Sequence, residues 1–385
     1  MKRVDIIYFE ASSGHKSAAE ALRHGLQDRS PEWDVRCVDL GDVLKHQTRL
    51  LGWIYNFGIF FFNGCMKRER YFFFCTSIKL WVAFARLITR FSCFRFLLKW
   101  TANFWGDRAP DALISVTPMK HTIVYEAARC IHPDVLCITV PVDYSEMVSG
   151  YWFQPRIRQH YLLGCEGLKN EAFASAVPAD EINELSGMIV DPRFYADSEL
   201  DRDQFLVDLG LDPALPTGII SFGGQGTVNV LRCAKQIARA RIPVNLICLC
   251  GRNQKLHDSV KALETPFPLA ALNFTEDPPV DAHRIAEFLI GKPGTMTLNE
   301  AVITRTAFVF IKSRGLNVVQ GANEQWVVQN GTGVACESPD FVDQAVRKVL
   351  GDFEMSQRIE RAQHRGIFDA VQLITKMVSN TSPSF

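Results

Sequence analysis

The sequence predicts an α/β protein with two domains, each built around a doubly wound parallel sheet. Short apolar runs alternate with amphipathic stretches along most of the chain, which is typical of strand–helix–strand units. A turn rich in small residues follows a predicted strand in each half, at residues 12–15 and 291–295. With 385 residues, 47% of them hydrophobic, the chain is long enough to bury two cores.

In the first half, an apolar strand is expected at residues 4–9 and a helix at 16–27. The alternation then continues, around a long aromatic insertion, with strands at 35–39, 111–115 and 135–140 and a helix at 119–131. Parallel strands need crossover helices of this kind, so the pattern predicts a parallel sheet. We expect this first domain to span residues 1–200.

A polar stretch at residues 197–216 carries Pro213 and Pro216 and is the predicted linker. The second domain, residues 201–385, is expected to repeat the alternation. Its predicted elements are strands at 218–222, 244–250, 288–291 and 307–311 and helices at 228–240, after 253, from 297, and near 323 and 339. The last helix is expected to pack back on the first domain.

Composition excludes some classes of function. The 42 basic and 42 acidic residues cancel, so the chain has no broad basic field for nucleic acid. Its 11 cysteines lack the regular spacing of a disulfide framework, and reduced, mostly buried thiols are expected. Asp5 and Glu10 interrupt the apolar run that follows Met1-Lys2-Arg3, so we expect no signal peptide and a cytoplasmic location.

An insertion at about residues 49–105 combines aromatic and basic side chains. From residue 49 to residue 99, Glu69 is the single acid among nine Lys and Arg residues. The pattern from 79 to 100 fits a basic amphipathic helix on an anionic membrane surface. The predicted membrane contacts are Trp81, Arg86, Arg90 and Arg95.

Two further observations limit this interpretation. The longest uncharged run, residues 50–66, is shorter than the roughly 20 residues that span a bilayer. An aromatic core whose arginines extend to water is the alternative to membrane contact.

Four motifs occur in the order typical of one family. They are Ser13-Gly14-His15-Lys16, Phe222-Gly223-Gly224-Gln225-Gly226, Cys250-Gly251-Arg252-Asn253, and Gly291-Lys292-Pro293-Gly294-Thr295 continuing through Glu300 to Asn323-Glu324-Gln325. Over nearly its whole length the chain therefore resembles the monogalactosyldiacylglycerol synthase and processive diacylglycerol glucosyltransferase group, which is similar to glycosyltransferase family 28. The resemblance implies the GT-B fold, in which two Rossmann-like domains face each other across a cleft.

The resemblance also implies an inverting transfer of a hexosyl group from a UDP-sugar to the hydroxyl of a diacylglycerol-like membrane lipid, with no required cofactor. Such a transfer needs a general base, and His15 is the candidate. Asp143 is either a rival base or the carboxylate that orients His15, while Ser13 and Gly14 form the acceptor loop. Structural roles stay open, because His15 can hold its turn and Asp143 can cap a loop.

On the donor side, glycine-rich turns before helices present backbone N–H groups to the diphosphate. These groups belong to Gly224, Gln225, Gly226 and Thr227 and to Gly294, Thr295, Met296 and Thr297. The resemblance assigns Glu300 to the ribose, Gly251, Arg252 and Asn253 to the base pocket, and Asn323, Glu324 and Gln325 to the donor sugar.

Asp201-Arg202-Asp203 imitates a metal-binding Asp-x-Asp motif but lies in the predicted linker. We interpret it as a solvated charge run and expect no required metal.

The sequence departs from the family pattern at three places. Ser12-Ser13 stands where the family has more glycine, the histidine usual between Asp143 and Trp152 is absent, and residues 312–322 lack the usual proline and glycine-glutamine pattern. Two other functions therefore stay open: a nucleotide-sugar epimerase of similar fold, and a catalytically silent scaffold on a membrane surface.

Overall fold

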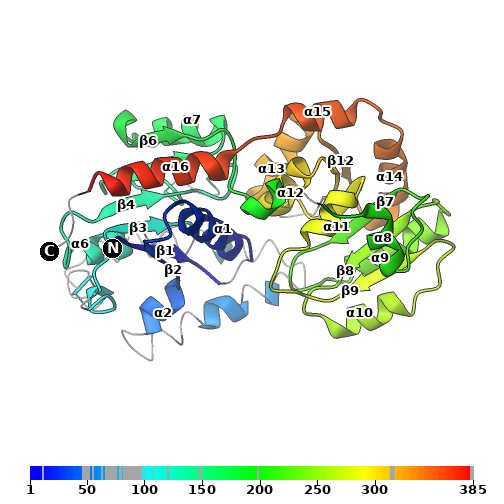
Figure 1. The fold of residues 1–385 in the computed structure, drawn as a ribbon, viewed down its shortest axis with the longest axis horizontal. Helices are drawn as coiled ribbons and strands as arrows, with labels where there is room; N and C mark the ends of the chain where they lie inside the picture. The colour runs from blue at the N-terminus through cyan, green and yellow to red at the C-terminus, as the bar shows by residue number, and fades with distance from the viewer. Residues whose placement is uncertain are drawn as a thin grey trace. The chain divides into compact units, whose positions relative to one another are not determined.

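A computed structural model describes most of the chain, and Figure 1 shows its two α/β units. The described residues are 1–10, 13–45, 53, 56–61, 64–65, 76–77, 80, 98–99, 101–106, 108–118, 121–146, 150–196, 199–312 and 317–381. One compact unit comprises Met1–Pro192 with His364–Phe385, and the other comprises Arg193–Gln363. Trp81, Arg86, Arg90 and Arg95, the predicted membrane contacts, lie outside the described residues.

The first unit contains a six-stranded parallel sheet in the order β2-β1-β3-β4-β5-β6. The strands are β1 (Arg3–Tyr8), β2 (Asp34–Asp39), β3 (Ala112–Ser115), β4 (Leu136–Thr139), β5 (His160–Leu163) and β6 (Ile182–Glu184). The first four correspond to the predicted strands, which confirms the expected parallel sheet. The sequence did not indicate β5 and β6. The edge strand β6, Ile182–Glu184, has one apolar residue and therefore forms no apolar run.

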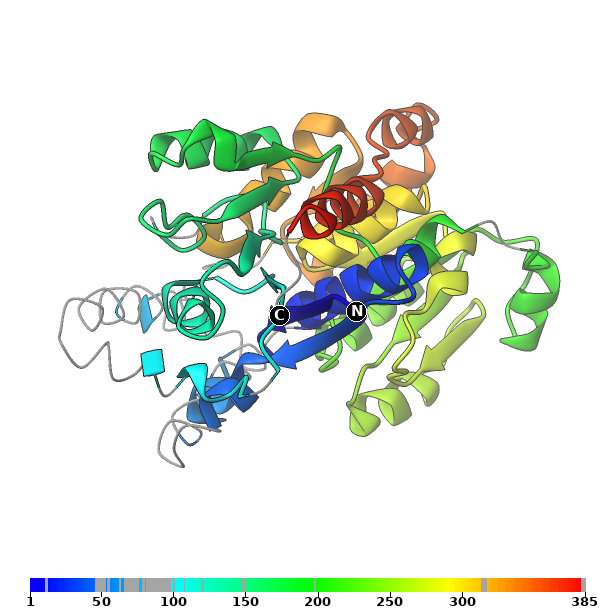
Figure 2. The same cartoon turned by 60° about the vertical axis from the view of Figure 1, so that its left-hand side comes forward.

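Helices flank this sheet. They are α1 (Ser13–Arg29), α2 (Leu40–Lys45), α6 (His121–Arg129), α7 (Glu166–Ala174) and α16 (Gly366–Ser379). The last helix, α16, packs against α1, as Figures 1 and 2 show. An added Cβ at Gly25 of α1 would lie 2.6 Å from Cγ2 of Val371 in α16, so a glycine permits this close approach.

A buried carboxylate connects β1 with the segment that follows the aromatic insertion. Asp5 is fully buried, and its oxygens accept hydrogen bonds from Arg36 at 2.7 and 2.8 Å. Trp105 donates its indole N–H at 2.9 Å, and Arg108 adds a guanidinium at 2.7 Å. Because a buried charge must be paired and hydrogen-bonded, this network fixes the end of the insertion to the strand that leads to His15.

The second unit repeats the architecture with the order β12-β11-β10-β7-β8-β9, again all parallel. The strands are β7 (Thr217–Ser221), β8 (Asn245–Leu249), β9 (Leu269–Leu272), β10 (Phe288–Gly291), β11 (Ala307–Ile311) and β12 (Gly333–Cys336). Its helices are α8 (Arg202–Asp208), α9 (Asn229–Arg239), α10 (Gln254–Lys261), α11 (Val280–Ile285), α12 (Thr295–Ile303), α13 (Asn317–Asn330), α14 (Val342–Leu350) and α15 (Met355–Arg361). The two neighbours of β7, namely β10 and β8, bring three strand ends together at one edge of this sheet.

The polar stretch predicted as a linker is partly helical. It contains α8, which belongs to the second unit. Asp201 caps this helix by accepting hydrogen bonds from the backbone N–H groups of Asp203 and Gln204, both at 3.1 Å. Asp201 and Asp203 are exposed, as expected for a solvated charge run, and Asp201 has the additional role of capping α8.

Within the described ranges, every helix is too short or too polar to cross a bilayer.

Candidate active site

The first candidate site lies at the carboxyl edge of the first sheet, where β1, β3 and β4 are neighbours. His15 sits in the first turn of α1, directly after β1, and its Nδ1 lies 2.7 Å from the carbonyl oxygen of Val116, which follows β3. A carbonyl only accepts hydrogen bonds, so Nδ1 carries the proton and Nε2 is the basic nitrogen of the neutral ring. Burial lowers the pKa of His15 to about 4, while the hydrogen bond to Val116 acts in the opposite direction. The ring is therefore neutral at neutral pH.

Trp152 connects His15 with Asp143. Its indole ring is fully buried and lies 6.2 Å from the His15 ring, centroid to centroid, at 52°. The indole N–H donates a hydrogen bond of 3.2 Å to Oδ2 of Asp143. Burial raises the pKa of Asp143 to about 6, although this hydrogen bond acts in the opposite direction. The Val116 carbonyl thus orients His15, while Asp143 is hydrogen-bonded to the Trp152 indole.

The His121 ring also packs against Trp152. Its ring stacks on Trp152 with centroids 6.3 Å apart and on Tyr125 with centroids 5.6 Å apart. Nε2 donates to the Thr117 carbonyl at 2.8 Å, and burial lowers the pKa of His121 to about 4, so this ring is also neutral. His121 could not be predicted as a site residue from the sequence, because no motif contains it, and Trp152 matched the family pattern without an expected role.

The second candidate site lies at the carboxyl edge of the second sheet, where the turns after β7 and β8 interlock. Gly226 has a φ of 64°, and an added Cβ would lie 1.9 Å from the Cys250 carbonyl oxygen. Gly251 has a φ of 58°, and its added Cβ would lie 2.5 Å from the Gly224 carbonyl oxygen. Only glycine fits at either position, because a side chain would face both a positive φ and a backbone clash.

The side chains around these turns already have partners. Asn253 caps α10 by accepting from the Leu256 N–H at 3.1 Å, and its amide donates to the Gly226 carbonyl at 3.1 Å. Arg252 lies 3.5 Å over the Phe274 ring and pairs with Glu276 at 3.3 Å. Asn253 thus holds the two turns together, while the exposed Arg252 stacks on the half-buried ring of Phe274.

A third turn, residues 292–294, connects β10 with α12. Asn323 of α13 is buried and donates from its amide to the Pro293 carbonyl at 2.8 Å and to the Thr295 hydroxyl at 3.1 Å. This clamp holds the turn at the start of α12, where the first N–H groups of a helix lack intrahelical partners.

The remaining predicted donor residues lie on α12, on α13 and in the turn after β7. Met296, Thr297 and Glu300 are half-buried in the first two turns of α12. On α13, burial raises the pKa of Glu324, although Lys312 acts in the opposite direction. Gln325 is exposed, as is Gln225 in the turn after β7.

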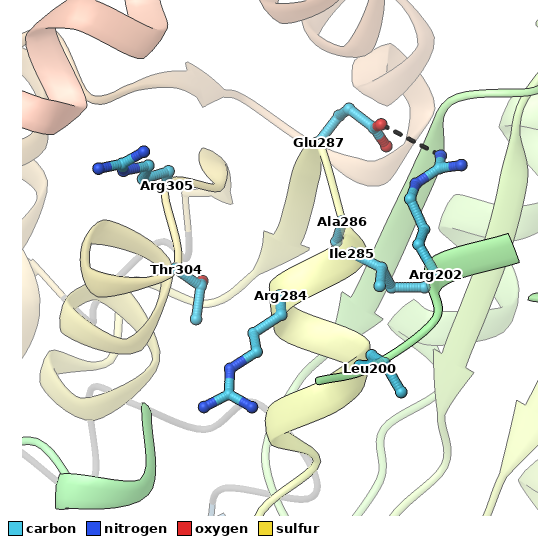
Figure 3. A pocket seen from close by; sticks show the side chains of 8 residues that line it. All are labelled: Leu200, Arg202, Arg284, Ile285, Ala286, Glu287, Thr304 and Arg305. Carbon is cyan, nitrogen blue, oxygen red and sulfur yellow. Dashed lines mark hydrogen bonds and ion pairs between the residues drawn. The ribbon is translucent and has the colours of Figure 1, made fainter. Parts of the chain in front are cut away.

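A separate hollow of about 410 Å³ opens at the opposite edge of the second sheet (Figure 3). Glu287 precedes β10 there, and Thr304 and Arg305 follow α12. Its arginines are already paired, Arg202 with Glu287 at 3.4 Å, Arg284 with Asp281 at 3.6 Å, and Arg305 with Glu360 at 3.3 Å. None of the predicted site residues lines it.

Potential metal ligands do not gather in the part of the chain that the structure describes. Nowhere among those residues do three or more His, Cys, Asp or Glu side chains lie close enough to hold a metal ion.

No family model matches the sequence. The chain is 26% identical to the probable monogalactosyldiacylglycerol synthase 2, chloroplastic, of Oryza sativa subsp. japonica, over 98% of this chain and 81% of that protein. It is 25% identical to monogalactosyldiacylglycerol synthase 2, chloroplastic, of Arabidopsis thaliana, over 99% and 82%. These relatives confirm the predicted resemblance to the monogalactosyldiacylglycerol synthase group.

Solved structures support the fold. The calicheamicin glycosyltransferase CalG4 matches with a TM-score of 0.59 and 13% identity, covering 99% of this chain and 100% of that one. A UDP co-structure of MnaA from S. aureus matches with a TM-score of 0.61 and 11% identity, covering 100% and 99%. The predicted GT-B fold and the predicted enzyme class, glycosyltransferase, are confirmed.

Proposed function

We propose that this chain, a glycosyltransferase of the GT-B fold, transfers a hexosyl group from a UDP-sugar to the hydroxyl of a diacylglycerol-like membrane lipid, with inversion at the anomeric carbon. The observation that carries the proposal is the cluster of His15, Trp152 and Asp143 at the carboxyl edge of the first sheet. It combines a neutral imidazole with a carboxyl group whose pKa is about 6. Both are mainly unprotonated near neutral pH, and the pKa of Asp143 lies closer to the value that suits a general base.

The proposed reaction is a direct displacement. The acceptor oxygen forms a bond to the anomeric carbon while the bond from that carbon to the diphosphate oxygen breaks, and its electron pair leaves with UDP. The acceptor proton moves to Nε2 of His15, or to Asp143 as the rival base. Ser13 and Gly14, which begin α1, would contact the acceptor beside His15.

The second unit would hold the donor. Backbone N–H groups of residues 224–227 and 294–297 would bind the diphosphate without a metal. Glu300 would bind the ribose, Arg252 and Asn253 would line the base pocket next to Gly251, and Asn323, Glu324 and Gln325 would approach the sugar. Support comes from the interlocked glycine turns and from the UDP bound by a protein of the same fold.

The acceptor would be reached at the cytoplasmic face of a membrane, to which the aromatic-basic insertion would bind. Among the insertion residues that the structure describes, Trp53, Phe57 and Phe60 have 64%, 54% and 76% of their surface exposed. Trp53 and Phe57 stack on each other at 5.7 Å. Exposed aromatic side chains in an insertion that is rich in Lys and Arg suit a headgroup boundary. They support the proposal together with the lipid in the names of the relatives.

The transfer is tested by incubating the purified protein with a panel of UDP-hexoses and vesicles that contain diacylglycerol. We expect a lipid-linked hexose whose anomeric configuration is opposite to that of the donor. Epimerised free nucleotide sugar would identify an epimerase instead. Vesicle binding without turnover would identify a silent scaffold.

The proposed contact between the aromatic-basic insertion and the membrane can be tested separately. Replacing Arg86, Arg90 and Arg95 together by Gln should reduce cosedimentation with anionic vesicles and lower activity on embedded acceptor, because each cation near an anionic surface contributes about 1 kcal/mol. High salt should weaken wild-type binding in the same way, since salt screens this attraction.

A matched variant controls for the loss of three charges. Lys235, Arg239 and Lys348 are exposed cations of the second unit, and their triple replacement by Gln should leave vesicle binding unchanged. Unfolding of the Arg86, Arg90 and Arg95 variant would favour the core-helix alternative. Equal vesicle binding by both triple variants would mean that these arginines are not the membrane contact.

A further inference from the structure

Lys292 lies among the glycine turns of the second unit but has no role in the proposed function. It follows β10 directly after Gly291, which pairs with Ser221 of β7. An added Cβ at Gly223 would lie 3.5 Å from both Cε and Nζ of Lys292, and one at Gly294 would lie 3.9 Å from Cε. The side chain therefore extends along the carboxyl edge of the sheet, between the turn after β7 and the turn before α12.

Lys292 is half-buried. Among the residues that the structure describes, no carboxylate pairs with it, and burial is the one cause that lowers its pKa. Lys312 offers a contrast, because it follows the adjacent strand β11 at the same edge and its Nζ lies 2.6 Å from Oε1 of Glu337. A desolvated cation is costly without a counter-charge, so an unpaired ammonium between two glycine turns is suited to an anion.

We infer that the Lys292 ammonium binds the diphosphate of the donor and stabilises the charge that develops on it during transfer, which makes Lys292 a catalytic residue. The inference rests on the proposed function. As the bond between the anomeric carbon and the diphosphate oxygen breaks, its electron pair stays on that oxygen. A fixed cation beside this oxygen therefore stabilises the transition state more than the ground state.

The position of Gly223 is consistent with this role. Its φ of 89° is accessible to glycine, and a side chain there would contact the ammonium in the space that a phosphate needs.

The test compares Lys292→Met with Lys312→Met by calorimetric titration with UDP, UMP and uridine. Lys292→Met should weaken UDP binding about tenfold or more, since a charge-assisted hydrogen bond to phosphate is lost, and should leave uridine binding unchanged. Lys312→Met should change UDP affinity by less than about twofold, because Lys312 is already paired. Turnover of Lys292→Met should fall on the order of a hundredfold, and Lys292→Arg should recover part of both losses.

Two outcomes would overturn the inference. Unchanged UDP affinity in Lys292→Met would remove the diphosphate contact. An equal loss of uridine and UDP affinity would show that Lys292 only supports the turn. If the wild-type protein binds UDP but transfers no sugar, the proposed reaction fails, and the comparison of UDP with uridine still decides the role of Lys292. If the wild-type protein does not bind UDP, both proposals fail.

Discussion

His15→Ala is expected to lower turnover by on the order of a hundredfold or more, with UDP affinity nearly unchanged. The reason is the position of the ring, which holds Nδ1–H on the Val116 carbonyl and leaves Nε2 as the basic nitrogen. The nucleotide would be held by the second unit, so the loss should appear in turnover rather than in calorimetric UDP binding. Wild-type turnover in His15→Ala would exclude His15 from the mechanism.

The pH profile separates the two candidate bases. Burial raises the pKa of Asp143 to about 6 and lowers that of His15 to about 4. A base must be unprotonated, so turnover should decline as the pH falls through about 6 if Asp143 is the base, and only near 4 if it is His15. If turnover of the wild type decreases near pH 6 and this decrease is absent in Asp143→Asn, then Asp143 is the general base. If turnover of Asp143→Asn still decreases near pH 6, Asp143 is not the general base.

Much of the fold could be predicted because its signals are local. The strand β1 and the helix α1 have clear apolar periodicity, and so do β7, α9 and β8 in the second unit. The edge strands β6 and β9 carry only three and four residues, and each pairs with a single strand at the edge of its sheet. Such strands form through tertiary pairing, which a single sequence does not display.

The candidate sites divide in the same way. The glycine turns could be predicted because the local backbone at Gly226 and Gly251 has a positive φ, which favours glycine. The contact between His121 and Trp152 could not, because it joins two segments far apart in the chain and no spacing rule relates them. The amides of Asn253 and Asn323 have structural hydrogen bonds beside the predicted ligand roles, which only the surrounding backbone reveals.

The largest effect on stability is expected from Asp5→Asn, which should lower the free energy of unfolding by about 3 kcal/mol. Asp5 is fully buried and accepts hydrogen bonds from Arg36, Trp105 and Arg108. A neutral amide leaves two guanidinium groups without their buried counter-charge and cannot accept all of these bonds. The expected loss is at the low end for a buried ion pair, because the Arg36 and Arg108 side chains are 36% and 26% exposed and water still reaches them.

Asp34→Asn is the matched control, since Asp34 pairs with the same Arg108 at 2.5 Å but its side chain is 37% exposed. An exposed pair contributes little, and this variant should lose less than about 1 kcal/mol. Urea unfolding followed by tryptophan fluorescence measures the free energy of unfolding of both variants. Equal destabilisation by the two substitutions would mean that Asp5 is no more than an ordinary surface partner of Arg108. A clearly larger loss for Asp5→Asn would indicate that the strand leading to His15 and the end of the insertion are stabilised by one buried charge.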